Sequence, residues 1–139
     1  MKPKPSCLLL KNSFVTELRF SANPKFKPRE KTLLEFEDLQ IESTARQPSN
    51  DSKDWQVCLQ ISYAGKDKCN VPYSFRIVMF GYFGVAKDVP ADEVEKFVQV
   101  NGSSVLFSSA REILKCAMAN GPFSQIVLPA VSFFEQSKK

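Results

Sequence analysis

Residues 101–134 read NGSSVLFSSAREILKCAMANGPFSQIVLPAVSFF, and this stretch decides how the rest of the chain folds. Its apolar residues recur at the spacing of one helix face: Leu106, Phe107, Ala110, Ile113, Leu114, Ala117 and Met118. Asn120-Gly121-Pro122 predicts the end of this helix, because Asn and Gly tolerate the left-handed conformation and Pro cannot continue a helix. A helix with such an apolar face needs a surface to cover.

The chain before residue 87 supplies that surface, since it has the patterns of β-strands. Apolar and polar residues alternate over residues 6–20, 32–47, 55–63 and 71–85. The first of these segments is expected to place five apolar side chains on one face: Leu8, Leu10, Phe14, Leu18 and Phe20. From Val78 onward the last segment is apolar on both faces, which predicts burial on both sides or a subunit contact.

The connections also have clear signals. Pro24 and Pro28 predict an irregular loop between the first two strands, because each proline lacks a backbone donor. A short helix is expected from Pro90 to Val100, with a break at Asn101-Gly102 before the main helix. These patterns predict one α+β domain over residues 1–139, with residues 1–5 as a flexible tail.

The composition argues against an enzyme. The 139 residues contain no histidine, which excludes Ser/His and Cys/His nucleophilic sites and removes the commonest neutral metal ligand. Gly81 and Gly84 are not followed by the Lys-Ser/Thr of a phosphate loop. Acidic strand residues could act as acid–base groups, but solvated charge is the better interpretation for Glu35, Glu37 and Asp38. We therefore expect no catalytic activity, metal or cofactor.

Charge and cysteine usage limit the partners and the compartment. The net charge of +4 is spread over the termini and one loop, whereas nucleic-acid binders have a denser basic face. No apolar run has the length of a signal peptide core or a membrane span. Cys7, Cys58, Cys69 and Cys116 are far apart, which favours reduced thiols. We expect a cytoplasmic protein without nucleic-acid binding or membrane insertion.

Two segments resemble the SecB family of protein-export chaperones. Residues 105–112, VLFSSARE, resemble the part of that family's long helix in which apolar residues and a Phe precede Ala-Arg-Glu. Residues 121–133, GPFSQIVLPAVSF, resemble its run Gly-x-Phe-x-Gln-x-x-Leu-x-Pro-Val-x-Phe, with Pro and Ala shifted here. Residues 81–85 and 20–24 show weaker similarity. The resemblance covers most of the chain and is strongest over the last third.

The resemblance implies a four-stranded antiparallel Greek-key sheet packed against a long, broken C-terminal helix. It also implies a homotetramer, assembled as a dimer of dimers, and an ATP-independent holdase for unfolded or preprotein polypeptides. Carried over, the client groove would use residues for which core packing is the alternative: Phe20, Phe26, Leu33, Leu34, Phe36, Ile126, Leu128, Phe133 and Phe134. The core and subunit interface would use Leu106, Phe107, Ala110, Ile113 and Leu114.

The chain departs from the family in ways that affect its partners. SecB proteins of the export pathway are acidic and offer carboxylates to the SecA motor, whereas this chain is basic. Ser21 stands where the family has an acidic residue, and only residues 133–139 correspond to its C-terminal helix. These departures disfavour SecA as a partner and favour a dedicated client, such as a toxin–antitoxin pair. The alternative is an interaction or scaffold module for one partner, such as an antitoxin.

Overall fold

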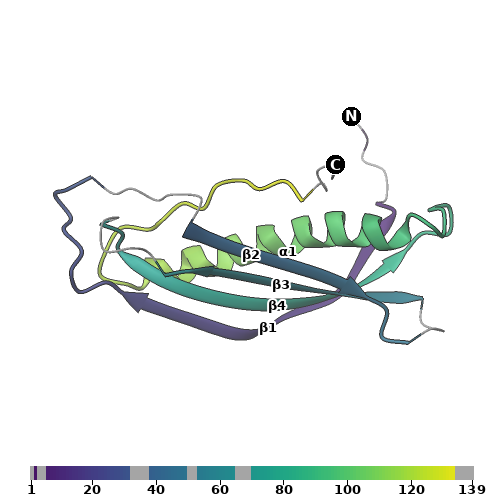
Figure 1. Ribbon diagram of the computed structural model, residues 1–139, viewed down its shortest axis with the longest axis horizontal. Coiled ribbons are helices and arrows are strands. Elements are labelled where there is room, and N and C mark those ends of the chain that lie inside the picture. Colours follow the sequence, from purple (N-terminus) through teal and green to yellow (C-terminus); the bar gives the residue numbers. More distant parts are fainter. Residues whose placement is uncertain (1, 3–5, 32–37, 50–52, 65–69, 134–139) are drawn as a thin grey trace.

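The computed structural model describes residues 2, 6–31, 38–49, 53–64 and 70–133 (Figure 1). Its elements are β1 (Leu8–Ala22), β2 (Leu39–Arg46), β3 (Asp54–Tyr63), β4 (Tyr73–Val85) and α1 (Val94–Ala119). The four strands form one antiparallel sheet in the order β1-β4-β3-β2, and α1 covers one face of it. This order is a Greek key whose long connection joins β1 to β2. The predicted α+β class and sheet are therefore confirmed.

The core lies between the sheet and α1. On β3 the residues facing the helix are almost completely buried, whereas the intervening residues are only partly buried: the buried set is Val57, Leu59, Ile61 and Tyr63. On β4 the buried residues that face the helix are Tyr73, Phe75, Ile77, Met79 and Phe83. We call the opposite, helix-free side of the sheet the open face. One covered face and one uncovered face explain why β3 alternates so strictly in sequence.

Strand β1 corrects the predicted arrangement of side chains. Its pairing with β4 has two register shifts, one between Leu10 and Asn12 and one between Val15 and Glu17. Each shift moves the following side chains to the other face, as β-bulges do. Phe14 therefore pairs with Phe80 on the open face, whereas Val15 takes the place on the helix side. Leu8, Leu10, Leu18 and Phe20 share the helix-facing side, as expected.

The predicted break at Asn101-Gly102 is wrong, because α1 is continuous from Val94 to Ala119. Gly102 is buried on the side of α1 that packs against the sheet. A Cβ atom at residue 102 would lie 2.9 Å from Val57 Cγ2 and 3.2 Å from Phe83 Cε2. Gly102 thus permits close helix–sheet packing instead of ending a helix. The predicted stop is confirmed: the amide of Gly121 donates to the carbonyl of Met118, just after Ala119.

The other boundaries differ modestly. The segment expected as a strand from residue 32 is β2 from Leu39 onward, and residues 32–37 lie outside the described residues, as does most of the predicted tail. The cysteines among the described residues, Cys7, Cys58 and Cys116, form no disulfide, and Cys69 lies outside. Burial raises the pKa of the Cys58 thiol. In the described part of the chain, no helix combines the length and the apolar content needed to cross a membrane.

Candidate functional site

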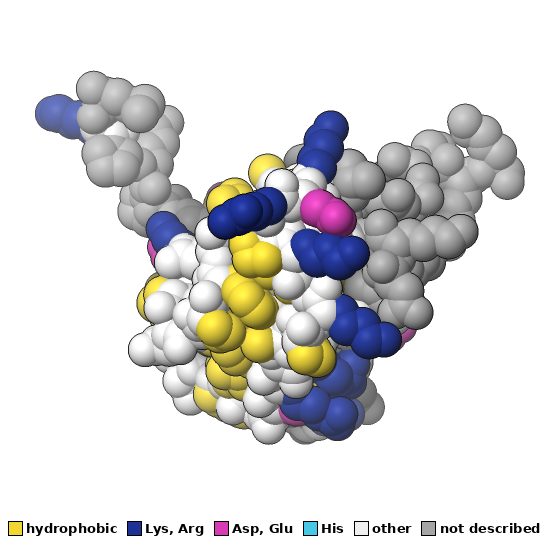
Figure 2. Space-filling view, turned by 90° about the vertical axis from the view of Figure 1, so that its left-hand side faces the viewer, with side chains coloured by type: hydrophobic (Ala, Val, Ile, Leu, Met, Phe, Trp, Pro, Cys, Tyr) yellow, Lys and Arg dark blue, Asp and Glu magenta, His cyan; other side chains and the backbone are white. Residues whose placement is uncertain are grey.

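An aromatic cluster closes the end of the sheet beside the loop that follows β1. Phe20 and Tyr73 have ring centroids 4.8 Å apart, and Phe26 lies 4.8 Å from Phe123 in the same way. Tyr73 and Phe123 are 6.0 Å apart and connect the two pairs. Figure 2 views this end of the molecule and shows hydrophobic side chains gathered in a stripe, with several Lys and Arg side chains beside it. We call Phe20, Phe26, Tyr73 and Phe123 the aromatic cluster.

Tyr73 anchors the segment that follows α1 through hydrogen bonds to Phe123. Its hydroxyl donates to the carbonyl of Phe123 at 2.8 Å and accepts from the amide of Phe123 at 2.7 Å. Gly121 allows this approach, because a Cβ atom there would lie 2.5 Å from the Tyr73 hydroxyl. The sequence Gly-Pro-Phe after α1 is therefore a docking turn that places Phe123 against Tyr73 and Phe26.

Asparagine side chains hold the loop between β1 and residue 31 against the start of β4. Asn23 Nδ2 donates to the carbonyl of Val71 at 2.9 Å, and the Lys27 amide donates to Asn70 Oδ1 at 2.8 Å. Asn70 Nδ2 also donates to the carbonyl of Lys27 at 2.9 Å. These bonds replace strand pairing for a segment that contains Pro24 and Pro28, and they position Phe26 over Phe123.

After α1 the chain continues as an extended segment, residues 124–133, that runs back along the helix (Figure 1). Ile126 and Leu128 are buried, whereas Val127 between them is 80% exposed. The Ile126 amide donates to Met118 Sδ at 3.4 Å, which ties the segment to the end of α1. A groove of about 390 Å³ lies between it and α1, lined by Ser108, Arg111, Glu112, Lys115, Gln125, Ile126, Val127 and Leu128. An extended segment beside a groove can accept another extended chain.

The predicted groove residues separate into three groups. Phe20 and Phe26 lie together in the aromatic cluster and are partly buried. Ile126 and Leu128 belong to the core, and Phe133 packs on Phe107 with centroids 5.7 Å apart. Ile126 and Leu128 also line the groove beside α1, so their expected contact with a client stays a prediction. Leu33, Leu34, Phe36 and Phe134 lie outside the described residues.

The predicted interface residues are also mainly core. Leu106, Ala110 and Leu114 have no exposed surface, and Phe107 has only 3%. These side chains belong to the core of one chain, as expected, and their part in a subunit interface stays a prediction. Ile113 is partly buried.

The exposed apolar surface lies instead on β1, at the edge of the sheet. Five of the seven large apolar residues that are exposed in the described part of the chain belong to this strand: Leu9, Leu10, Phe14, Val15 and Leu18. The strand is 15 residues long and has β4 on one side only. A long apolar edge strand invites pairing with another chain.

Sequence reasoning missed three residues of these surfaces. Tyr73 and Phe123 were not expected to meet Phe20 and Phe26, because no local pattern shows contacts over 50 to 100 residues of sequence. Val127 had only a partial signal: alternation in an extended run places it on the side opposite Ile126 and Leu128, without saying which side is exposed. In the described ranges, no group of three or more Cys, Asp or Glu side chains is placed to hold a metal ion.

Comparisons with known proteins agree on one family. The sequence model described as preprotein translocase subunit SecB matches residues 9–137. The protein-export protein SecB of Psychrobacter cryohalolentis is 29% identical over 105 residues, which are 73% of this chain and 68% of that protein. Those of Psychrobacter arcticus and Zymomonas mobilis are each 28% identical, over 69% and 57% of this chain and 63% and 48% of their own length. The chain thus spans about half to two thirds of these relatives.

Solved structures share the fold at low sequence identity. One is the Mycobacterium tuberculosis Rv1957 SecB-like chaperone in complex with a ChAD peptide from the Rv1956 HigA1 antitoxin. It superimposes with a TM-score of 0.71 at 11% identity and covers 90% of this chain and 91% of that one. A protein of unknown function from Streptococcus agalactiae superimposes with a TM-score of 0.51 at 13% identity, over 88% of this chain and 96% of its own. Both similarities concern the fold.

Proposed function

Since the chain belongs to the SecB family, we propose that it is a chaperone that holds non-native polypeptides without ATP, cofactor or catalysis. The observation that carries this proposal is the extended segment 124–133. Ile126 and Leu128 anchor it to the core, and Val127 between them is 80% exposed beside the groove. An extended client can add to such a segment through main-chain hydrogen bonds, which do not depend on the client's sequence.

The aromatic cluster supports a client path along the same side of the molecule. Phe26 and Phe123 are each only partly buried and stand on the chain that leads into residues 124–133. We propose that a client runs from the aromatic cluster into the groove beside Val127. Apolar contact at the cluster and backbone pairing at the segment would then act together.

For the client itself we propose one dedicated partner system in the cytoplasm, with protein export as the alternative. The basic net charge of +4 does not suit the acidic surface that the resemblance associates with SecA. The structural relative from Mycobacterium tuberculosis holds an antitoxin peptide, which supports an antitoxin as a candidate client. A scaffold for one folded partner remains the second candidate function.

The proposal is tested by aggregation of a thermally unfolded enzyme, followed by light scattering. The purified chain is expected to suppress scattering when it is present at equimolar tetramer, with no nucleotide added. The same titration against the native enzyme should show no binding. If scattering is unchanged while a folded antitoxin binds tightly, the scaffold function is correct instead.

Val127→Asp is expected to raise the Kd for an unfolded client about tenfold. The substitution places a charge beside the groove and removes an apolar side chain that a client would cover, a loss of roughly 1.5 kcal/mol. Since Val127 is 80% exposed, the melting temperature should stay within about 1 °C. Fluorescence anisotropy with a labelled, permanently unfolded client measures the Kd.

The matched control is Ala130→Asp, on the same extended segment but outside the groove lining. It adds the same charge at an exposed residue and should leave the client Kd unchanged. Equal weakening by both variants would mean that charge on the segment matters and the groove does not.

A further inference from the structure

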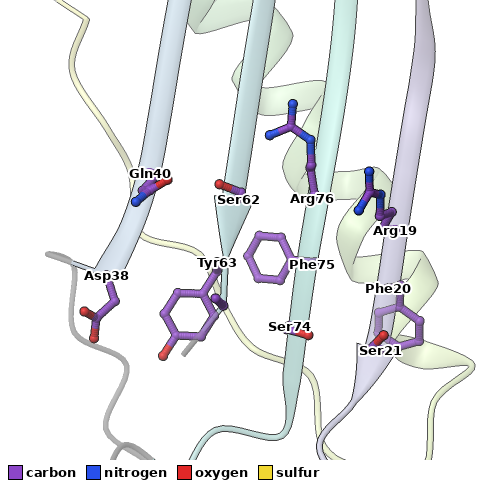
Figure 3. A pocket seen from close by; sticks show the side chains of 11 residues that line it. Arg19, Phe20, Ser21, Asp38, Gln40, Ser62, Tyr63, Ser74, Phe75 and Arg76 are labelled. Atoms are coloured by element: carbon purple, nitrogen blue, oxygen red, sulfur yellow. The ribbon is translucent and has the colours of Figure 1, made fainter. Parts of the chain in front are cut away.

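A second cavity lies on the open face, near the end of the sheet where β1 finishes. It has a volume of about 690 Å³, and all four strands contribute to it. Its polar lining includes Arg19, Ser21, Gln40, Ser62, Ser74 and Arg76 (Figure 3). Asp38 also lines it, but on the β2 side, separated from the arginines of β1 and β4 by β3. The cavity is distinct from the client groove, which α1 and the extended segment form on the other side of the sheet.

The two arginines form an unfavourable pair. Arg19 on β1 lies directly opposite Arg76 on β4 in the antiparallel register. Like charges in directly opposed positions destabilise a sheet. Two residues further along β1, after the Phe20–Phe75 pair, Ser21 lies opposite Ser74. Both serines line the same cavity as the two arginines. A cationic pair beside hydroxyl donors is a feature of anion-binding sites.

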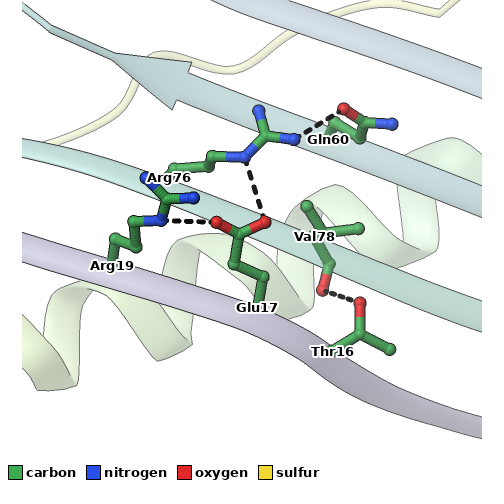
Figure 4. Close-up of polar contacts among 6 residues, drawn as sticks. All are labelled: Thr16, Glu17, Arg19, Gln60, Arg76 and Val78. Atoms are coloured by element: carbon green, nitrogen blue, oxygen red, sulfur yellow. Dashed lines mark hydrogen bonds and ion pairs between the residues drawn. The ribbon is translucent and has the colours of Figure 1, made fainter.

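Glu17 compensates this pair only in part. Its carboxylate oxygens meet Arg19 Nε at 2.6 Å and Arg76 Nε at 3.2 Å (Figure 4). A hydrogen bond from Arg76 holds the pKa of the Glu17 carboxyl below its usual range, against the effect of desolvation and with the help of the Arg19 charge. Glu17 is therefore ionised at neutral pH. Its single negative charge is shared between the positive charges of Arg19 and Arg76.

The guanidinium groups retain capacity for a ligand. Glu17 occupies the Nε atoms, and Arg76 Nη2 donates to Gln60 Oε1 at 3.1 Å. Among the described residues, no side chain or carbonyl binds the Nη atoms of Arg19, whose side chain is 76% exposed. A carboxylate can accept two parallel hydrogen bonds from such a guanidinium edge.

We propose that this cavity binds carboxylate side chains of an acidic polypeptide segment. Arg19 and Arg76 supply the charge, the serine hydroxyls supply further donors, and the volume exceeds what a single small anion needs. A polypeptide fits better than a free anion because the donors are spread over β1, β4 and β3. The proposed site is a local basic patch at the β1 end of the open face, next to Phe20 of the aromatic cluster.

The probe for the test is a fluorescein-labelled hexaglutamate peptide, measured by anisotropy with the full chain at about 50 mM salt. Hexaglutamate is expected to bind and hexalysine is not. Arg19→Gln should weaken binding about fivefold, the scale of one exposed ion pair, and Arg19→Gln with Arg76→Gln by more than tenfold. Glu17→Gln should strengthen binding several-fold, because it removes the carboxylate that competes with the peptide.

Lys11→Gln is the matched control. Lys11 lies on the same strand and is paired with Asp54 at 2.7 Å near the opposite end of the sheet, outside the cavity. It removes one positive charge and should leave the affinity unchanged. Arg76 also holds Glu17 and Gln60 in place, so thermal unfolding must show that its variant folds. The exposed Arg19 variant decides the question even if the double variant does not fold.

Three results would overturn the site. The first is equal loss in the Arg19 and Lys11 variants, which would show a general charge effect. The second is unchanged or weaker binding after Glu17→Gln. The third is binding of hexalysine as tightly as hexaglutamate. Because no unfolded client is present, failure here leaves the holdase proposal standing, and failure of the aggregation assay leaves this site standing.

Discussion

Gly102→Val is expected to lower the free energy of unfolding by about 3 kcal/mol, the upper part of the range for overpacked cores. The first added carbon would lie 2.9 Å from Val57 Cγ2 and 3.2 Å from the Phe83 ring. Both of those side chains are completely buried, so neither can move into solvent. The helix must instead separate from the sheet, which also weakens the packing of Leu106 one turn further on. Urea unfolding followed by circular dichroism measures the change.

Asn101→Val is the control for helix propensity. Asn101 is the exposed neighbour of Gly102, and Val has a helix propensity close to that of Asn. This variant should change stability by less than about 0.5 kcal/mol. If Gly102→Val were as mild, or stabilising as expected for a glycine in an uncrowded helix, then Gly102 would be a simple weak point in α1, as the sequence pattern indicates.

Gly102 illustrates why the sequence predicts the strands and the helix but not every contact between them. Alternation on β3 and the helical spacing of Leu106, Ala110 and Leu114 come directly from one buried face, so the sequence contains them. A glycine inside a helical pattern has two opposite explanations, a break or a close contact. The choice depends on Val57 and Phe83, which reach Gly102 only through the tertiary fold.

The bulges of β1 have the same origin. The sequence of residues 8–20 alternates well enough to suggest one continuous apolar face, with Phe14 on it. The register against β4 shifts twice, and Phe14 instead stacks with Phe80 on the open face at a centroid distance of 6.0 Å. Nothing local distinguishes a bulged strand from a regular one here, because the shift is set by which residues of β4 fit opposite.

The candidate site was predictable by segment and less so by residue. The family resemblance directed attention to residues 121–133, and the structure finds the groove and Val127 there. Ile126 and Leu128, which we expect to meet a client, line the groove and also anchor the segment to the core. In an extended segment, alternate residues have opposite surroundings, and the sequence does not say which set faces inward.

Val15→Glu combined with Leu18→Glu on β1 is expected to convert an oligomer into monomers. We propose a homotetramer, a dimer of dimers, whose assembly covers this edge strand. Val15 and Leu18 are 36% and 45% exposed and lie on the helix-facing side next to the sheet edge. Covering each would contribute roughly 1 kcal/mol, and a two-fold contact uses each residue twice. The variant should therefore weaken the dimer by at least about 100-fold, before the cost of placing four carboxylates near one another.

Light scattering coupled to size-exclusion chromatography measures the molar mass of the assembly directly. For the wild type it should give about four times the 15.7 kDa mass of one chain. The control is Asn12→Glu with Thr16→Glu, which puts the same two charges on the same strand at exposed polar residues. That variant keeps every apolar side chain of β1 and should remain tetrameric. A monomeric wild type would contradict the assembly outright. A tetramer that survives the Val15 and Leu18 changes would move the interface away from β1. Because neither residue lies in the core, the melting temperature of the released monomer separates lost assembly from lost folding.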